Sequence, residues 1–143
     1  MTPYVTQFIE PYELAQFEEI CRVVRELPDL ELGFNKDGSR ILLSCHILSR
    51  AVAMVFELKY VDGFFKPHYQ HSWVLNERGN LIDVYPVAMV GGPIMYPHQT
   101  LDHNCPSHRL YEKDRLRLKT RNRAFCRALG IVTQEIRRLH GQS

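Results

Sequence analysis

Cys45, His71 and Asp83 follow one another along the chain and are residue types that together carry out acyl transfer. A thiol becomes a good nucleophile when a base takes its proton and a third group orients that base. Cys45 follows Ser44, a residue type that caps helices, at the start of an apolar run with helical spacing. Because free N–H groups and the helix dipole favour a thiolate at that end, we predict that Cys45 is the nucleophile.

His71 and Asp83 lie in two predicted strands, HSWVL and LIDVYPV, which the turn NERGN joins. A turn with an odd number of residues would make the two directly opposed partners, with Cβ atoms roughly 4.5 to 5.5 Å apart. The carboxylate of Asp83 could then bind one imidazole nitrogen and leave the other for the thiol. A carboxylate inside an apolar strand also needs partners that offset its desolvation, which supports this pairing.

The motifs SCHILSRAV, HSWV and IDVYP together resemble the transglutaminase-like branch of the papain-like cysteine enzymes. The resemblance covers roughly residues 41 to 87. It implies a helix packed on an antiparallel sheet, with Cys45 as nucleophile, His71 as base and Asp83 as the orienting group. Members of this family include peptidases, deamidases, amidases and acyl transferases, so the expected substrates are peptides, proteins or small amides, esters or thioesters. We expect no cofactor for this chain. The expected activity is therefore that of a cysteine hydrolase or acyltransferase.

Three further residues are predicted to contact the substrate: His46, Gln70 and Trp73. His46 lies beside the nucleophile, whereas strand alternation turns Gln70 to the face opposite His71 and weakens its candidacy. The backbone N–H of Cys45 or His46 could stabilise the oxyanion.

The spacing of apolar residues predicts the elements that must position this site. The predicted class is α+β, in which N-terminal helices pack on a small antiparallel sheet and a long helix ends the chain. The expected helices are Pro11 to Leu27, a buried helix within Ile41 to Phe56 that begins near Ser44, and Asp114 to about His140, with a possible break near Gly130. The expected strands are Leu58 to Phe65, Gln70 to Asn76 and Leu81 to Val87, with a further one possible at Val90 to Tyr96.

Composition limits the class of protein. The 143 residues, 45% hydrophobic and 24% charged, are typical of one globular domain spanning residues 1 to 143. With 18 basic and 16 acidic residues, the net charge of +2 indicates neither a nucleic-acid nor a membrane partner. The first residues resemble no signal peptide, so the cytoplasm is the expected compartment and the four cysteines are expected to be free thiols.

Other interpretations of the sequence stay open beside the enzyme. The chain could be a catalytically inactive member of the same fold that serves as a binding module. The segment PHQTLDHNCPSHRL carries the zinc-capable residues His98, His103, Cys105 and His108, to which His46 and His68 could add, but its spacing matches no familiar motif and we predict no metal. The basic run RLRLKTRNR is typical of a solvated helix face rather than of a phosphate site. Substrate identity and oligomeric state are not predicted.

Overall fold

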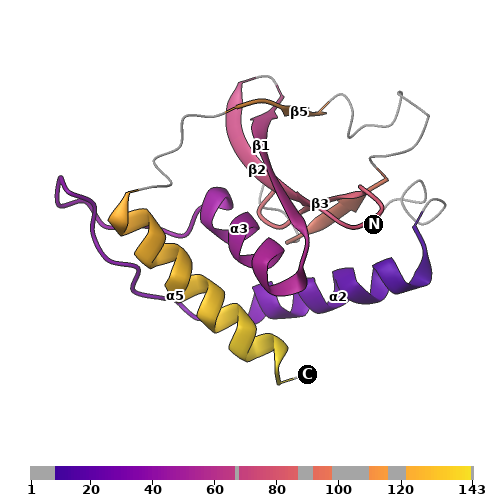
Figure 1. Cartoon of the computed structure of the whole chain (residues 1–143), viewed down its shortest axis with the longest axis horizontal. Coiled ribbons are helices and arrows are strands. Elements are labelled where there is room, and N and C mark those ends of the chain that lie inside the picture. Colours follow the sequence, from indigo (N-terminus) through magenta and orange to yellow (C-terminus); the bar gives the residue numbers. More distant parts are fainter. Residues whose placement is uncertain (1–8, 67, 87–91, 98–109, 116–121, 143) are drawn as a thin grey trace.

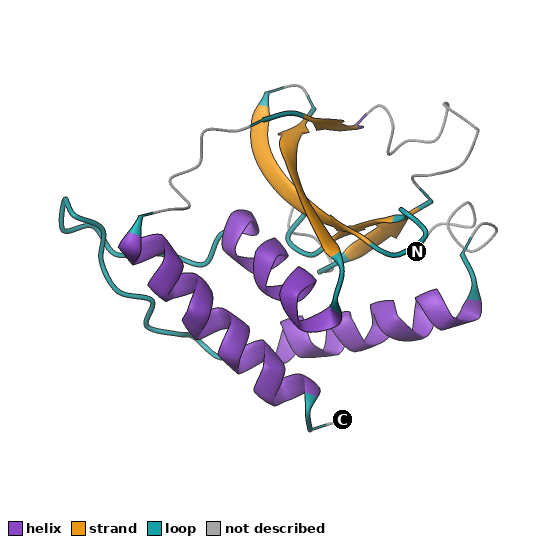
Figure 2. Cartoon of the chain, in the orientation of Figure 1, coloured by secondary structure: helices purple, strands orange, loops and turns teal. Residues whose placement is uncertain are grey.

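Three helices lie on one side of a curled antiparallel sheet in the described part of the computed structural model (Figures 1 and 2). The structure describes residues 9–66, 68–86, 92–97, 110–115 and 122–142. The helices are α2 (Pro11–Glu26), α3 (Cys45–Phe56) and α5 (Arg123–His140). The α+β class and the C-terminal helix are thus confirmed. In the described residues, no helix has both the length and the apolar character needed to span a membrane.

Within the described ranges, five strands form one sheet in the order β4-β3-β2-β1-β5. They are β1 (Lys59–Phe65), β2 (Tyr69–Leu75), β3 (Leu81–Asp83), β4 (Ile94–Tyr96) and β5 (Tyr111–Lys113). Strand β3 is shorter than the predicted strand to Val87, a residue outside the described ranges, as are Val90 and Gly91 of the predicted fourth strand.

The boundary of the C-terminal helix was predicted too early. Residues 111 to 113 pair with β1 as strand β5, and the N–H of Asp114 donates to the Asp62 carbonyl of the same strand. Asp114 and Arg115 are not helical, so the expected helix start at Asp114 is wrong. The helix begins at Arg123, where the side chain of Asn122 accepts a hydrogen bond from the Ala124 N–H. It then continues through Gly130 without a break. Of the segment predicted as the C-terminal helix, the described part that is helical spans residues 123 to 140.

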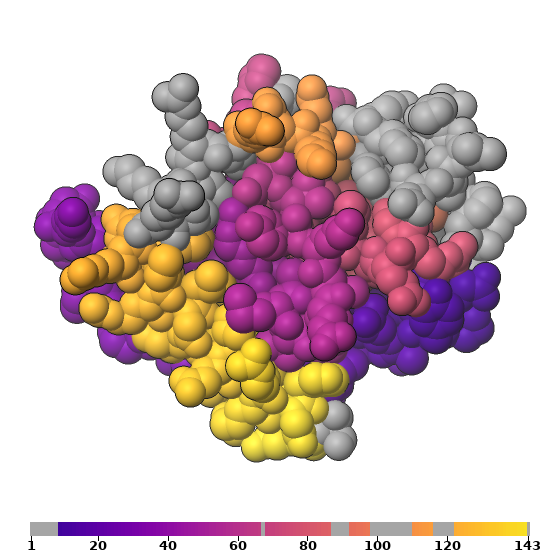
Figure 3. All heavy atoms as spheres, in the orientation of Figure 1, coloured from indigo at the N-terminus to yellow at the C-terminus, as the bar shows by residue number. Residues whose placement is uncertain are grey.

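Helix α3 is the central element that carries Cys45. It packs against β1 and β2 on one side and against α5 on the other, and its residues Leu48, Ala51 and Val52 are fully enclosed in the main core. Figure 3 shows that the segment of α3 and β1 reaches the surface between α5 and α2. Ser44 caps the helix as predicted, because its Oγ accepts a hydrogen bond from the Ile47 N–H.

The two faces of the sheet bury different residues. Val74, Ile82 and Met95 join the main core with the helices, whereas Val61, Trp73, Leu81 and Tyr111 form a second cluster. Gly63 lies opposite His71 in β1, and a Cβ there would come within 2.1 Å of the Glu112 carbonyl oxygen. The absence of a side chain at this position therefore lets β5 pair closely with β1 beside the second cluster.

A buried carboxylate on α2 holds the turn between β2 and β3. Glu13 is 1% exposed and accepts hydrogen bonds from the side chains of Asn76 (2.6 Å), Asn80 (2.8 Å) and Arg78 (2.6 Å). Within the turn, Asn76 Oδ1 accepts from the Arg78 and Asn80 N–H groups, and Gly79 adopts a φ of 78°. The turn between β2 and β3 is thereby held against α2.

The register of the hairpin differs from the prediction for the candidate site. Leu75 pairs with Leu81, so the turn spans residues 76 to 80 and one further step places Asp83 across from Trp73 rather than His71. Direct opposition of His71 and Asp83 is therefore wrong, because the asparagine contacts centre the turn on Arg78. The displacement is an even number of residues, so both side chains stay on one face as diagonal neighbours.

Candidate functional site

Cys45 is the first residue of α3. The Ile47 N–H is bound by the Ser44 side chain and the Leu48 N–H by the Ser44 carbonyl. The N–H groups of Cys45 and His46 therefore have no intrahelical partner. The side chain of Cys45 is half-buried. A half-buried sulfur at the positive end of a helix is well placed to exist as an anion.

The partners of Asp83 give His71 a fixed orientation. His71 Nε2 lies 2.8 Å from Asp83 Oδ2, and both side chains are buried. A carboxylate only accepts, so Nε2 carries the hydrogen and Nδ1 is the nitrogen left for another partner. Tyr111 donates its hydroxyl to the same Asp83 oxygen over 2.7 Å, and the Tyr85 N–H donates to Oδ1. The diagonal placement is thus close enough for the predicted imidazole and carboxylate contact.

Electrostatics link Cys45 to His71. Burial by itself would raise the pKa of the Cys45 thiol, but hydrogen bonding and charge from His46 and His71 outweigh it and lower the pKa to about 6. Burial would lower the pKa of His71, but Asp83 and Cys45 outweigh it and raise the pKa to about 9. The interval between these values is where a thiolate and an imidazolium coexist.

Cys21 and Tyr111 have the raised pKa values of ordinary buried side chains. Burial raises the pKa of the Cys21 thiol, which lies in the main core. Burial, followed by the charge of Asp83, raises the pKa of the Tyr111 hydroxyl, which stays a hydrogen-bond donor. The arrangement around Cys45 thus differs from that of a thiol that is merely enclosed.

The three predicted substrate contacts have different surroundings. His46 is half-buried beside Cys45, and its Nδ1 lies 2.6 Å from Ser72 Oγ. Gln70 is exposed, and by alternation it points away from the face of His71. Trp73 is 1% exposed and stacks beside His71, with ring centroids 6.2 Å apart. Trp73 therefore packs beside the imidazole of His71 in the interior. Substrate contact by His46, Gln70 and Trp73 stays a prediction.

Tyr111 and Ser72 are the site residues that the sequence interpretation missed. Tyr111 lies in a three-residue strand far from the triad in sequence, where no spacing pointed to it. Ser72 had a usable signal, since a small polar residue lies between His71 and Trp73 in a strand with alternating faces. Its buried hydroxyl requires hydrogen-bond partners, which are Asp62 on β1 and His46 on α3.

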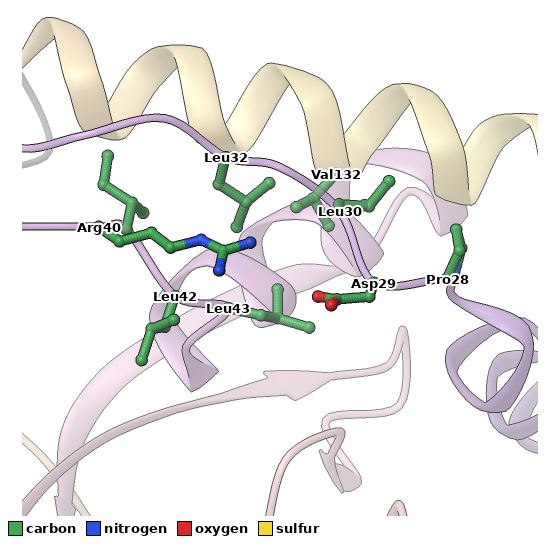
Figure 4. A pocket seen from close by; sticks show the side chains of 9 residues that line it. Pro28, Asp29, Leu30, Leu32, Arg40, Leu42, Leu43 and Val132 are labelled. Carbon is green, nitrogen blue, oxygen red and sulfur yellow. The ribbon is translucent and has the colours of Figure 1, made fainter.

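The cavity beneath α5 does not include the residues of the candidate site, and the described residues form no metal site. A cavity of about 270 Å³ lies under α5, where Arg40 and Asp29 point into a space lined by leucines (Figure 4). Its lining includes Leu42 and Leu43 but not Cys45 or His71. Within the described ranges, no group of three or more His, Cys, Asp or Glu residues could hold a metal. The zinc-capable residues His98, His103, Cys105 and His108 lie outside the described residues.

The site therefore combines a helix-terminal thiol, an imidazole that lowers its pKa and a carboxylate that orients the imidazole. Comparisons of the chain with protein-family models, curated protein sequences and solved structures found no match.

Proposed function

We propose that this protein is a thiol-dependent acyl-transfer enzyme with Cys45 as nucleophile, His71 as general acid and base, and Asp83 as the orienting group. The observation that carries the proposal is the His71 to Asp83 hydrogen bond of 2.8 Å, on an imidazole that also lowers the pKa of Cys45. The order of the three residues and the helix packed on an antiparallel sheet further support a transglutaminase-like branch of the papain-like fold.

In the first step, the thiolate of Cys45 attacks the carbonyl carbon of an amide, ester or thioester. A carbon–sulfur bond forms as the carbonyl π electrons move to oxygen. The N–H groups of Cys45 and His46 can stabilise that oxygen, because the helix does not use them. The tetrahedral intermediate then collapses, the bond to the leaving group breaks, and His71 gives its Nδ1 proton to that group. The product is an acyl-enzyme thioester on Cys45.

In the second step, the neutral His71 removes a proton from water or from an amine that attacks the thioester. The carbon–sulfur bond breaks, the thiolate returns and the imidazolium is restored. Asp83 keeps its charge throughout and stabilises the imidazolium, in the role that a carboxylate has in catalytic triads. Tyr111 and the Tyr85 N–H hold the carboxylate in place through hydrogen bonds to its two oxygens.

The test is incubation of the whole chain with small activated esters and thioesters, followed by intact-mass and peptide mass spectrometry. We expect an acyl group on Cys45 and more than one product released per chain. Cys45→Ala should show neither, while Cys126→Ala should behave as the parent, since Cys126 lies exposed on α5. Acylation that favours Cys126, or turnover that survives Cys45→Ala, would refute the proposal.

A further inference from the structure

A second imidazole, that of His46, lies next to Cys45 and is held by a chain of polar contacts. Its Nδ1 is 2.6 Å from Ser72 Oγ, and Ser72 Oγ donates to Asp62 Oδ1 over 2.5 Å. Arg50 donates to Asp62 Oδ2 over 2.7 Å and to the carbonyl of His46 over 3.1 Å. These contacts connect the first turns of α3 to β1 and β2. His46 is therefore held at its backbone carbonyl and at Nδ1 of its ring.

The hydrogens in this chain have one consistent assignment. The Asp62 carboxylate can only accept, so the single hydroxyl hydrogen of Ser72 is committed to it. Ser72 Oγ must then accept from His46, which places a hydrogen on Nδ1 of that ring. Nε2 is consequently the nitrogen of His46 that remains for Cys45. In His71 the remaining nitrogen is Nδ1, because Nε2 binds Asp83.

We propose that His46 is a positioning residue for the nucleophile: Ser72, Asp62 and Arg50 fix its ring so that Nε2 faces the Cys45 sulfur. In the imidazolium form, in which both ring nitrogens carry a hydrogen, Nε2 donates to the thiolate that His71 also stabilises. The inference rests on the proposed function and adds a second support for the same thiolate. A helix-terminal cysteine flanked by two anchored imidazoles is held in its reactive form from two directions.

The charges around the sulfur agree with this assignment. Burial opposes ionisation of Cys45, and hydrogen bonds from both His46 and His71 lower its pKa against that burial. The facing groups are Arg50 on α3, Asp62 on β1, His71 on β2 and Asp83 on β3. Asp62 is neutralised by Arg50, with which it forms a largely buried ion pair, so its contact through Ser72 orients the His46 ring more than it adds charge.

The test measures the pH dependence of Cys45 alkylation by iodoacetamide, followed by peptide mass spectrometry. His46→Asn is the sharpest change, because the asparagine amide can replace Nδ1 and keep the Ser72 contact while Nε2 is lost. We expect the alkylation midpoint to rise by about one pH unit. His46→Gln, whose amide nitrogen can occupy the place of Nε2, should recover part of the shift. The matched control is His68→Asn at an exposed position, which should leave the midpoint unchanged.

Ser72→Ala provides a second test that leaves the imidazole in the chain. Loss of the anchor should also raise the midpoint, by less than His46→Asn does. This variant decides the matter if His46→Asn fails to fold, as judged by thermal unfolding. Midpoints equal to that of the parent in His46→Asn or in Ser72→Ala would overturn the role given to His46.

The same data separate this inference from the proposed function. If the parent protein alkylates Cys45 with the midpoint of an unfolded chain, the proposed function fails along with the inference. If His71→Ala removes the low midpoint while His46→Asn and Ser72→Ala retain it, the proposed function stands and the inference alone is wrong.

Discussion

Two buried carboxylates, Glu13 and Asp83, have similar burial but different partners. Each is almost fully enclosed, and each is satisfied by several hydrogen bonds. The partners of Glu13 are side-chain amides, a guanidinium and a backbone N–H, none of which changes its protonation state near neutral pH. Asp83 instead binds an imidazole that lowers the pKa of a thiol.

The comparison shows that a buried carboxylate by itself does not indicate an active site. Both groups need partners to offset desolvation, and both obtain them. Asp83 differs because its partner His71 can gain and lose a proton at Nδ1, the ring nitrogen that does not contact the carboxylate. We therefore assign a structural role to the Glu13 cluster, which contacts the turn, whereas a chemical role for Asp83 is part of the proposed function.

The largest expected effect comes from exchanging the two acids for their amides. Asp83→Asn should lower the rate of Cys45 acylation by a thioester by about 10² to 10⁴-fold, because the amide disturbs the tautomer and charge of His71. Glu13→Gln keeps an acceptor for the asparagine amides and should leave that rate close to the parent. Stopped reactions analysed by mass spectrometry give both acylation rates. Equal decreases in the two variants would contradict the different roles of the two acids.

Removal of the Glu13 side chain tests its structural role. Glu13→Ala leaves the amides of Asn76 and Asn80 without their acceptor in a buried turn. We expect the free energy of unfolding to fall by about 2 to 4 kcal/mol, measured by urea denaturation. A loss below about 0.5 kcal/mol, the usual range for surface substitutions, would show that the cluster does not hold the turn.

The hydroxyl of Tyr111 should matter less than the carboxylate it contacts. Tyr111→Phe removes one donor from Asp83 Oδ2 but leaves His71 bound to that oxygen. A hydrogen bond of about 1 kcal/mol corresponds to roughly a fivefold change in acylation rate. Asn122→Ala, which removes the cap of α5 far from Asp83 in sequence, controls for a general loss of stability. A loss in Tyr111→Phe as large as in Asp83→Asn would contradict the ranking.

Acid should weaken the Glu13 cluster. Burial raises the pKa of Glu13, but the hydrogen bonds from the Glu10 N–H, Asn76, Asn80 and Arg78 outweigh it and hold the pKa below its ordinary value of 4.5. The unfolded chain therefore binds this proton first, so the stabilisation is complete above pH 4.5 and is lost as pH falls through the folded pKa. The stability difference between the parent and Glu13→Ala should accordingly shrink at low pH in urea titrations. A difference that is independent of pH would assign the effect to packing.

The sequence predicted the parts of the fold that depend on local spacing. Ser44 and the apolar stripe after it located the start of α3, and the strands around His71 followed from their aromatic and β-branched residues. The register did not follow, because Glu13, far away on α2, selects the turn. Tyr111 and strand β5 were missed for the same reason, since a three-residue strand exists only through its pairing with β1.

The central claim is that folding converts the Cys45 thiol into a thiolate near neutral pH. Its most direct test is the pH dependence of iodoacetamide alkylation at Cys45 in the folded chain and in the same chain unfolded in urea. We predict a midpoint of about 6 in the folded protein, against roughly 8.5 for the unfolded chain. A folded midpoint equal to or above the unfolded one would contradict the account.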